Sequence, residues 1–248
     1  MAPAGIDESK YRKGIVTARR DVGEGLWIVR VRPRDPIAFR AGQYVTVGLQ
    51  TEGKLVERPY TVASAPREDE LEFFLELVSG GKLTPHLHHA GVGDEVYLRP
   101  AAKGRFLFDE ASGHRNHFMV ATVTGAAPFV SMIRSAAADA PYRVLVLHGA
   151  SVSNEFGYAG ELLETSRRRS WLEYVPSISR PWLEPGWKGE RGRVEDVARK
   201  YIDAAGFRPG NTTAYACGNP QMIRNLEGIL TRAGFARESI KEEMYWRE

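Results

Sequence analysis

Apolar and polar residues alternate along the first half of the chain. Val45, Val47 and Leu49 share one such run, and the apolar residues of 71–77 flank Glu72 and Glu76 in another. A period of two is typical of strands with one buried face. Further runs at residues 14–20, 26–32, 56–64 and 95–98 are separated by Gly, Pro and Asp. This spacing predicts an antiparallel six-stranded β-barrel, with one short helix at residues 83–89.

From about residue 113 the pattern changes. Residues 117–123 and 143–148 are almost continuously apolar, as in strands that are buried on both faces of a parallel sheet. Helical segments at 128–138, 159–169, 194–203 and 220–231 alternate with further strands at 171–178, 212–217 and 240–246. The alternation predicts a doubly wound α/β domain with a five-stranded parallel sheet. We therefore expect two domains, residues 1–112 and 113–248.

Composition limits the partners and cofactors of the chain. Its 248 residues carry 34 Lys and Arg against 31 Asp and Glu, a net charge of +3. This weak excess favours an acidic partner, but without a dense basic stripe it does not indicate nucleic acid. The single cysteine, Cys217, allows no internal disulfide and no cysteine-ligated metal site. No apolar run reaches the roughly 18 residues of a membrane helix. We expect a cytoplasmic monomer without metal.

Residues suited to phosphate and ring binding follow the predicted strands of the second half, where open α/β sheets bind ligands. Thr124 and Gly125 open a small-residue turn into a helix, so that backbone N–H groups can face a pyrophosphate. An ordinary strand-to-helix turn explains these residues equally well. The run Cys217-Gly218-Asn219-Pro220 places a thiol and a glycine at a later strand end, beside a helix that Asn219 can cap. Glycine permits close approach of a ring, and the alternative is a buried cysteine that packs as a small hydrophobe.

Two arginines follow other strands of the same domain. Ser179 and Arg180 come after the strand at 171–178, and Arg193 stands where the next helix begins. A pair of guanidinium groups can clamp a 2′-phosphate by forked hydrogen bonds, which would favour NADPH over NADH. Two solvated surface arginines are the alternative interpretation.

The first half holds two further motifs. In Arg58-Pro59-Tyr60-Thr61 the alternation of a strand points Arg58 and Tyr60 to one side and Thr61 to the other. The arginine suits a phosphate and the tyrosine suits a flavin, although an edge strand marked by Pro59 is an equally good explanation. The run 79–84, Ser-Gly-Gly-Lys-Leu-Thr, supplies backbone donors and a hydroxyl suited to a pyrophosphate. Two phosphate-type sites indicate two nucleotides.

These motifs occur in the order that is typical of the ferredoxin–NADP reductase family, and the sequence resembles its bacterial branch along nearly the whole chain. RPYT is similar to the flavin-binding R-x-Y-[ST] motif, GGKLT to the flavin-phosphate loop and TGAAPF to the turn of the nicotinamide domain. SR with GR resembles the 2′-phosphate clamp, CGNPQM the nicotinamide-side signature, and Tyr245-Trp246 the aromatic C-terminus of the branch.

The resemblance implies an FAD-binding barrel, residues 1–112, and an NADP-binding domain, residues 113–248, whose aromatic tail returns to the flavin. It implies catalytic roles for Tyr60, Thr61, Cys217 and Tyr245. The implied cofactor-binding residues on the flavin side are Arg58, Pro59, Tyr60, Thr61, Phe74, Leu75, Glu76, Leu77, Lys82, Leu83, Thr84, Tyr245 and Trp246. Those on the NADP side are Thr124, Gly125, Ser151, Ser179, Arg180, Arg193, Cys217, Gly218, Asn219 and Pro220.

Two positions depart from the family pattern. Val123 stands where many members have glycine, and Ser151 stands where some have a further arginine. The implied function is the exchange of a hydride between NADPH and FAD and of single electrons with ferredoxin or flavodoxin. Two alternatives remain open. The first is another NADPH-dependent reductase, either the reductase component of an oxygenase or a diaphorase or flavin reductase. The second is a nucleotide-binding regulatory subunit without turnover.

Overall fold

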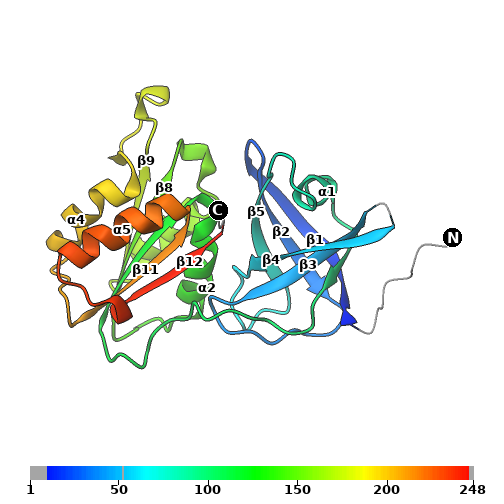
Figure 1. Cartoon of the computed structure of the whole chain (residues 1–248), viewed down its shortest axis with the longest axis horizontal. Coiled ribbons are helices and arrows are strands. Elements are labelled where there is room, and N and C mark those ends of the chain that lie inside the picture. Colours follow the sequence, from blue (N-terminus) through cyan, green and yellow to red (C-terminus); the bar gives the residue numbers. More distant parts are fainter. Residues whose placement is uncertain (1–9, 52, 246–248) are drawn as a thin grey trace. The chain divides into compact units, whose positions relative to one another are not determined.

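The computed structural model describes residues 10–51 and 53–245, which form two compact units. The first unit runs to Leu107 and also includes Ala127–Ser135. The second comprises Phe108–Ala126 and the chain from Ala136 onward. Figure 1 shows the elements of both units coloured along the sequence. The predicted division after residue 112 into an FAD domain and an NADP domain stays a prediction.

The first unit is built on a six-stranded antiparallel sheet. Its strands are β1 (Arg12–Gly23), β2 (Leu26–Pro33), β3 (Tyr44–Thr51), β4 (Lys54–Thr61), β5 (Leu71–Glu76) and β6 (Glu95–Leu98), in the order β4-β3-β6-β1-β2-β5. The sheet curls until its edges meet, because the Ala63 N–H, just beyond β4, donates to the Glu72 carbonyl on β5 at 2.8 Å. Trp27, Phe73 and Leu98 fill the interior, beside the short helix α1 (Thr84–His89). The barrel predicted from the period of two is confirmed.

Helix α2 (Ala127–Ser135) belongs to the barrel unit by its contacts. The Ser131 hydroxyl donates to the Ser64 carbonyl at 2.7 Å, and the Arg134 guanidinium donates to the Ala63 carbonyl at 3.1 Å and to the Glu72 carboxylate at 2.8 Å. The helix predicted at 128–138 therefore ends three residues earlier than expected and is anchored on the strand ends of the barrel.

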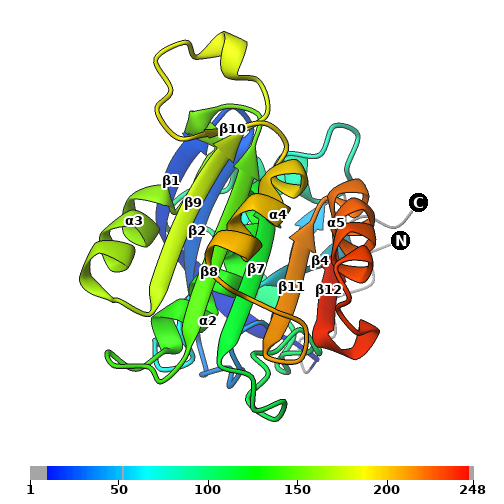
Figure 2. The same ribbon diagram turned by 90° about the vertical axis from the view of Figure 1, so that its left-hand side faces the viewer.

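The second unit is a doubly wound parallel sheet. Its strands are β7 (Asn116–Thr122), β8 (Arg143–Ala150), β9 (Leu172–Ile178), β10 (Glu190–Arg191), β11 (Thr212–Gly218) and β12 (Ile240–Met244), in the order β10-β9-β8-β7-β11-β12. Helices α4 (Val194–Ala204) and α5 (Pro220–Arg232) cover the face of the sheet that is turned to the viewer in Figure 2. Helix α3 (Ala159–Arg168) packs along β9.

The fold class is the predicted one, with two local differences. The described sheet has six strands instead of five, because β10 adds a pair of residues that is too short to leave a period in the sequence. Strand β7 ends at Thr122 and not at Val123, where the 3₁₀ turn η2 (Val123–Ala126) begins. Val123 has a φ of 44°, which no strand accommodates.

Candidate functional site

The RPYT motif lies on β4, an edge strand of the barrel sheet. Pro59 fits there because an edge strand leaves N–H positions without a ladder partner. Arg58 and Pro59 are exposed, Tyr60 is half-buried, and Thr61 is buried. Among the described residues, the Arg58 guanidinium donates only to the carbonyl of its own neighbour, Glu57, at 2.8 Å. An exposed cation beside a half-buried aromatic ring is suited to a ligand with both a phosphate and a planar ring system.

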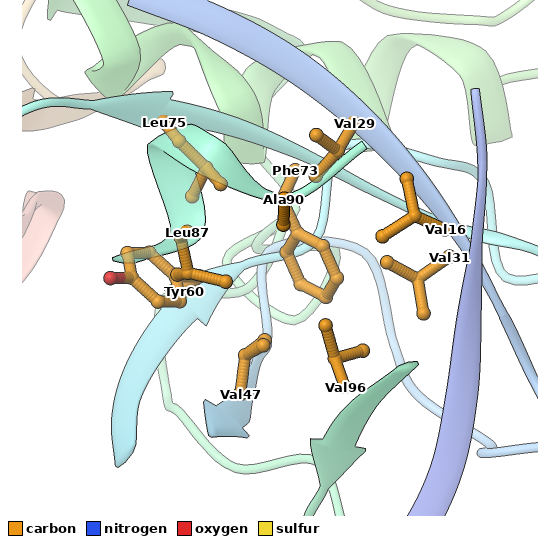
Figure 3. A pocket seen from close by; sticks show the side chains of 10 residues that line it. All are labelled: Val16, Val29, Val31, Val47, Tyr60, Phe73, Leu75, Leu87, Ala90 and Val96. Atoms are coloured by element: carbon orange, nitrogen blue, oxygen red, sulfur yellow. The ribbon is translucent and has the colours of Figure 1, made fainter. Parts of the chain in front are cut away.

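Tyr60 forms one wall of a small cavity inside the barrel (Figure 3). The other nine lining side chains are apolar, among them Phe73 and Leu75 of β5 and Leu87 of α1. The Tyr60 ring meets Phe73 edge-on, with 6.5 Å between ring centroids. Its hydroxyl points away from Phe73 in Figure 3 and is buried without a hydrogen-bond partner among the described residues. Burial raises the pKa of Tyr60 to about 12, against a small opposing effect of the Arg58 charge, so the hydroxyl keeps its proton.

The second flavin-side segment lies on the opposite edge strand, β5, and continues into the loop before α1. Phe74 and Leu75 are buried, Glu76 is exposed, and Leu77 is 38% exposed. Because the outer side of an edge strand has no ladder partner, its backbone groups can bond a ligand. The structure therefore brings the two predicted flavin segments to the two strands where the barrel sheet closes.

The loop between β5 and α1 is a tight turn. The Thr84 hydroxyl accepts the Val78 N–H at 3.0 Å, and the Gly81 N–H donates to the Val78 carbonyl at 2.9 Å. A Cβ at Gly81 would lie 2.9 Å from that carbonyl oxygen, so only glycine fits the turn. Lys82 is exposed, whereas Leu83 is 1% exposed and belongs to the barrel core. Leu83 can therefore serve a ligand only through its backbone.

In the second unit, the turn η2 is packed against the end of β11. The Thr122 hydroxyl accepts the Asn219 N–H at 2.8 Å and ties the two strand ends together. A side chain at Gly125 would collide with the Cys217 carbonyl, and one at Gly218 would collide with Thr122. Thr124 and Gly125 are buried within this turn. Both positions need glycine because the two backbone segments pack directly against each other. This contact lies at the edge of the sheet where open α/β sheets bind ligands.

Cys217 is fully buried at this strand end. Burial raises the pKa of the thiol, the Glu243 carboxylate raises it further, and a hydrogen bond with Tyr245 lowers it by less. The thiol therefore stays protonated and acts as a small, polarisable packing group rather than as a nucleophile. The Tyr245 N–H donates to the Gly218 carbonyl at 3.3 Å, so Tyr245 lies against the same strand end. Pro220 opens α5, and the Asn219 side chain caps it by accepting the N–H of Gln221 at 2.8 Å and of Met222 at 3.2 Å.

The residues predicted for a 2′-phosphate converge where β8, β9 and β10 end. The Arg180 N–H donates to the Ser151 carbonyl at 3.0 Å, and the Gly192 N–H donates to the Ile178 carbonyl at 2.9 Å. These bonds bring Ser151, Ser179, Arg180 and Arg193 to one edge. Arg180 and Arg193 are exposed, and neither guanidinium has a hydrogen bond or ion pair with another described residue. Two unpaired cations at one strand edge suit a dianionic group.

Sequence reasoning did not single out Thr122 and His148, which hold the turn η2 from two sides. A hydroxyl and an imidazole in apolar strands carry no local signal of this role. Trp246 lies outside the described residues. Within residues 10–51 and 53–245, no group of three or more His, Cys, Asp or Glu side chains is arranged to hold a metal ion. The same part of the chain has no helix that is long and apolar enough to cross a membrane.

Comparison with known proteins agrees with this geometry. Residues 15–108 match the oxidoreductase FAD-binding domain family, and residues 119–227 match the oxidoreductase NAD-binding domain family. The barrel, the sheet and their two sets of ligand-binding candidates thus define a flavin-dependent, NAD(P)-binding oxidoreductase.

Similar proteins identify the family within this class of oxidoreductases. The chain is 30% identical over 216 residues to a ferredoxin–NADP reductase of Pseudomonas aeruginosa, which covers 81% of this chain and 82% of that protein. It is also 30% identical over 237 residues to the phenol 2-monooxygenase reductase component of a Pseudomonas species, covering 94% of this chain and 65% of that protein. The chain belongs to the ferredoxin–NADP reductase family, in its bacterial branch.

A solved structure shows the same fold. A ferredoxin–NADP reductase from Neisseria gonorrhoeae with bound FAD and NADP superimposes with a TM-score of 0.85 at 23% identity, over 96% of this chain and 99% of that one. The residues of this chain fit an FAD. Tyr60 offers a buried hydroxyl that lacks a partner among the described residues. The Gly80-Gly81 turn carries no side chains, because Gly80 has a φ of 71° and a Cβ at Gly81 would lie 2.9 Å from the Val78 carbonyl oxygen.

Proposed function

We propose that this protein oxidises NADPH through bound FAD and passes single electrons to ferredoxin or flavodoxin. The observation that carries the choice of NADPH is the pair of exposed, unpaired guanidinium groups of Arg180 and Arg193. The backbone bonds that join the strand ends fix the backbone of this edge, whereas the two exposed side chains become ordered only when a 2′-phosphate binds. Hydrogen bonds to charged groups contribute about 1.5–3 kcal/mol each, enough to discriminate NADPH from NADH.

The residues of the barrel unit have separate roles in this proposal. Arg58, with Lys82 and the backbone of the 79–84 loop, would hold the FAD pyrophosphate, and Tyr60 and Thr61 would hold the flavin ring. Pro59 keeps the edge of β4 open, while residues 74–77 contact the flavin through their backbone. Bound FAD supplies the acceptor of the hydride and the release of electrons one at a time. The protein orients it and excludes water.

The residues of the second unit receive the dinucleotide. Thr124 and Gly125 face the pyrophosphate, and Cys217 and Gly218 offer a small surface to the nicotinamide beside the helix cap of Asn219 and Pro220. Tyr245 already bonds Cys217, so we propose that it must move before the ring can reach that thiol. Tyr245→Ala is then expected to tighten NADP⁺ binding and to change the rate of hydride transfer. An unchanged affinity together with an unchanged rate would remove Tyr245 from the mechanism.

The acceptor is proposed from the relatives. Proteins of Pseudomonas aeruginosa and Rhodobacter capsulatus that are 30% and 29% identical to this chain are named for ferredoxin, or for flavodoxin and ferredoxin. A role as an oxygenase reductase is the second candidate, favoured by the likeness to the phenol 2-monooxygenase component. With one cysteine, this chain cannot ligate an iron–sulfur cluster by four thiolates. Its location in the cytoplasm stays a prediction.

The test is an anaerobic absorption spectrum of the FAD-loaded protein before and after one equivalent of NADPH, with NADH in parallel. We expect NADPH to bleach the flavin band at far lower concentration than NADH. Arg180→Gln and Arg193→Gln should each reduce kcat/KM for NADPH about 10-fold or more and leave that for NADH almost unchanged.

Arg199→Gln is the matched control, because this exposed arginine on α4 pairs with Asp203 at 2.6 Å. It should leave the ratio of the two cofactors unchanged. A protein that retains no FAD, or a flavin that neither dinucleotide bleaches, would refute the proposal. Reduced enzyme that transfers electrons to quinones and free flavins, but to neither ferredoxin nor flavodoxin, would favour a diaphorase.

A further inference from the structure

The turn η2 begins with an unfavourable backbone conformation. Val123 has a φ of 44°, the one positive value among the described residues other than glycine. A side chain branched at Cβ is strongly disfavoured there, because its methyl groups crowd the neighbouring peptide. The conformation persists only if the surrounding structure compensates for it. The contacts of the Val123 carbonyl show where that compensation comes from.

His148 holds the Val123 carbonyl. The imidazole Nε2 lies 2.9 Å from the Val123 oxygen, and Nδ1 lies 3.0 Å from the Tyr174 hydroxyl. A carbonyl can only accept, so Nε2 carries the proton, and Nδ1 accepts from the tyrosine. The ring is fully buried, and burial lowers the pKa of His148 to about 4, which keeps it neutral near pH 7. Both nitrogens of a neutral imidazole are thus used, and the tautomer is fixed.

The imidazole is also held sideways. The Phe156 ring meets it edge-on, with 4.8 Å between centroids. Phe156 forms a small apolar cluster with Ala150 and Ile178, and Val123 packs against the same cluster. Rotation of the ring would break two hydrogen bonds in a site that water does not reach.

The bond determines the direction of the next N–H group. A trans peptide is planar, so the carbonyl of Val123 and the N–H of Thr124 point in opposite directions. Because the carbonyl is bound to His148 of β8, the Thr124 N–H points away from His148. The direction of this donor is in this way fixed before any ligand binds.

We propose that His148, oriented by Tyr174, is a positioning residue for the dinucleotide: it holds Val123 in its strained conformation so that the N–H groups of the turn face the pyrophosphate. The inference rests on the proposed binding of NADP(H) at this turn. In this proposal His148, a buried residue 25 positions after Val123, contributes to the affinity for NADP(H). A residue that only filled the core would affect stability and not that affinity.

The test is a double-mutant cycle on the FAD-loaded protein, with NADP⁺ binding measured by calorimetry. His148→Leu fills the space without a donor and should weaken NADP⁺ binding about 10-fold, whereas His148→Gln keeps an N–H at similar reach and should recover most of the affinity. Val123→Gly/His148→Leu should bind within about 3-fold of Val123→Gly alone, because glycine adopts a positive φ without support. Tyr174→Phe should weaken binding 2- to 3-fold.

His117→Leu is the matched control. His117 is equally buried, and its Nδ1 lies 3.1 Å from the Tyr215 hydroxyl, but it stands at the start of β7, at the other end of the strand from the turn η2. It should lower the melting temperature without changing NADP⁺ affinity.

Two results would overturn the inference: wild-type affinity in His148→Leu, or an equal loss of affinity with valine and with glycine at position 123. If His148→Leu does not fold, the same cycle with Tyr174→Phe decides. A wild-type protein that binds no NADP⁺ would refute the proposed function instead, so the two failures are distinguishable.

Discussion

The contact between Glu72 and Arg134 gives the sharpest prediction of stability. Glu72 is a buried carboxylate, with its side chain 8% exposed, and it accepts Arg30 Nε at 2.9 Å and Arg134 Nη1 at 2.8 Å. In Glu72→Gln, Arg30 keeps its ion pair with Glu68 at 2.6 Å and is partly exposed, so the change at Arg30 costs little stability. Arg134 is only 17% exposed, and its bond to the Ala63 carbonyl does not replace the charge of the carboxylate. Removing one partner of a buried pair costs about 3–5 kcal/mol, and the remaining bonds place this variant near the lower end, at about 3 kcal/mol.

Calorimetry measures the effect. For a chain of this size about 1 kcal/mol shifts the melting temperature by roughly 2–4 °C, so Glu72→Gln should melt about 6–12 °C below wild type. The control is Glu164→Gln on α3, where an exposed carboxylate pairs with Arg168 at 2.6 Å and with Arg167 at 3.7 Å. Exposed pairs contribute less than about 1 kcal/mol, and this variant should melt close to wild type. Equal melting temperatures for the two variants would show that Glu72 does not anchor α2 to the barrel.

Three further predictions follow from single positions. Gly125→Ala should lower the free energy of unfolding by about 1–3 kcal/mol and weaken NADP⁺ binding, because its Cβ would meet the Cys217 backbone, which cannot move aside. Thermal melting and NADP⁺ titration measure the two effects, and a variant that behaves like wild type would contradict the packing of the turn. Tyr60→Phe should leave the FAD-free protein as stable as wild type or more so, and should retain FAD less well in dialysis, since the hydroxyl has no partner among the described residues. Unchanged retention would mean that FAD does not use the hydroxyl. Burial lowers the pKa of His117 to about 4 from an ordinary value near 6.5, so the unfolded chain takes up its proton first as the pH falls. Stability is therefore complete above about pH 6.5 and declines towards pH 4, by about 3 kcal/mol for this residue; urea midpoints between pH 7 and pH 4 should fall less steeply in His117→Phe, and parallel curves would be the contrary result.

The sequence predicted most of the architecture because the period of apolar residues reports directly how a strand is buried. Runs with alternating burial became the antiparallel barrel, and continuous runs such as residues 143–148 became central strands of the parallel sheet. Strand β10 was missed because two residues have no period. The rule that ligands bind at the carboxyl ends of parallel strands led to the candidate site in the second unit, which stays a prediction; the rule needs only strand direction and not side-chain detail.

What could not be predicted depends on tertiary packing. Leu83 lies in a motif that suits a phosphate, yet its side chain belongs to the barrel core, and only the three-dimensional structure separates backbone from side chain in that role. Val123 is apolar and branched at Cβ, the composition of a strand, and the sequence therefore placed it in one. Its positive φ occurs together with a hydrogen bond from a residue 25 positions later.

Val123 also shows why local rules fail where they do. A local preference that opposes the observed conformation must be compensated elsewhere, and such conflicts concentrate at functional sites. Here the compensation has a cost of its own, because the supporting imidazole must remain neutral in an interior that water does not reach. A chain with glycine at position 123 would need neither the bond nor the buried histidine. The pairing of valine with His148 is therefore best understood as one unit, and the double-mutant cycle tests both members together.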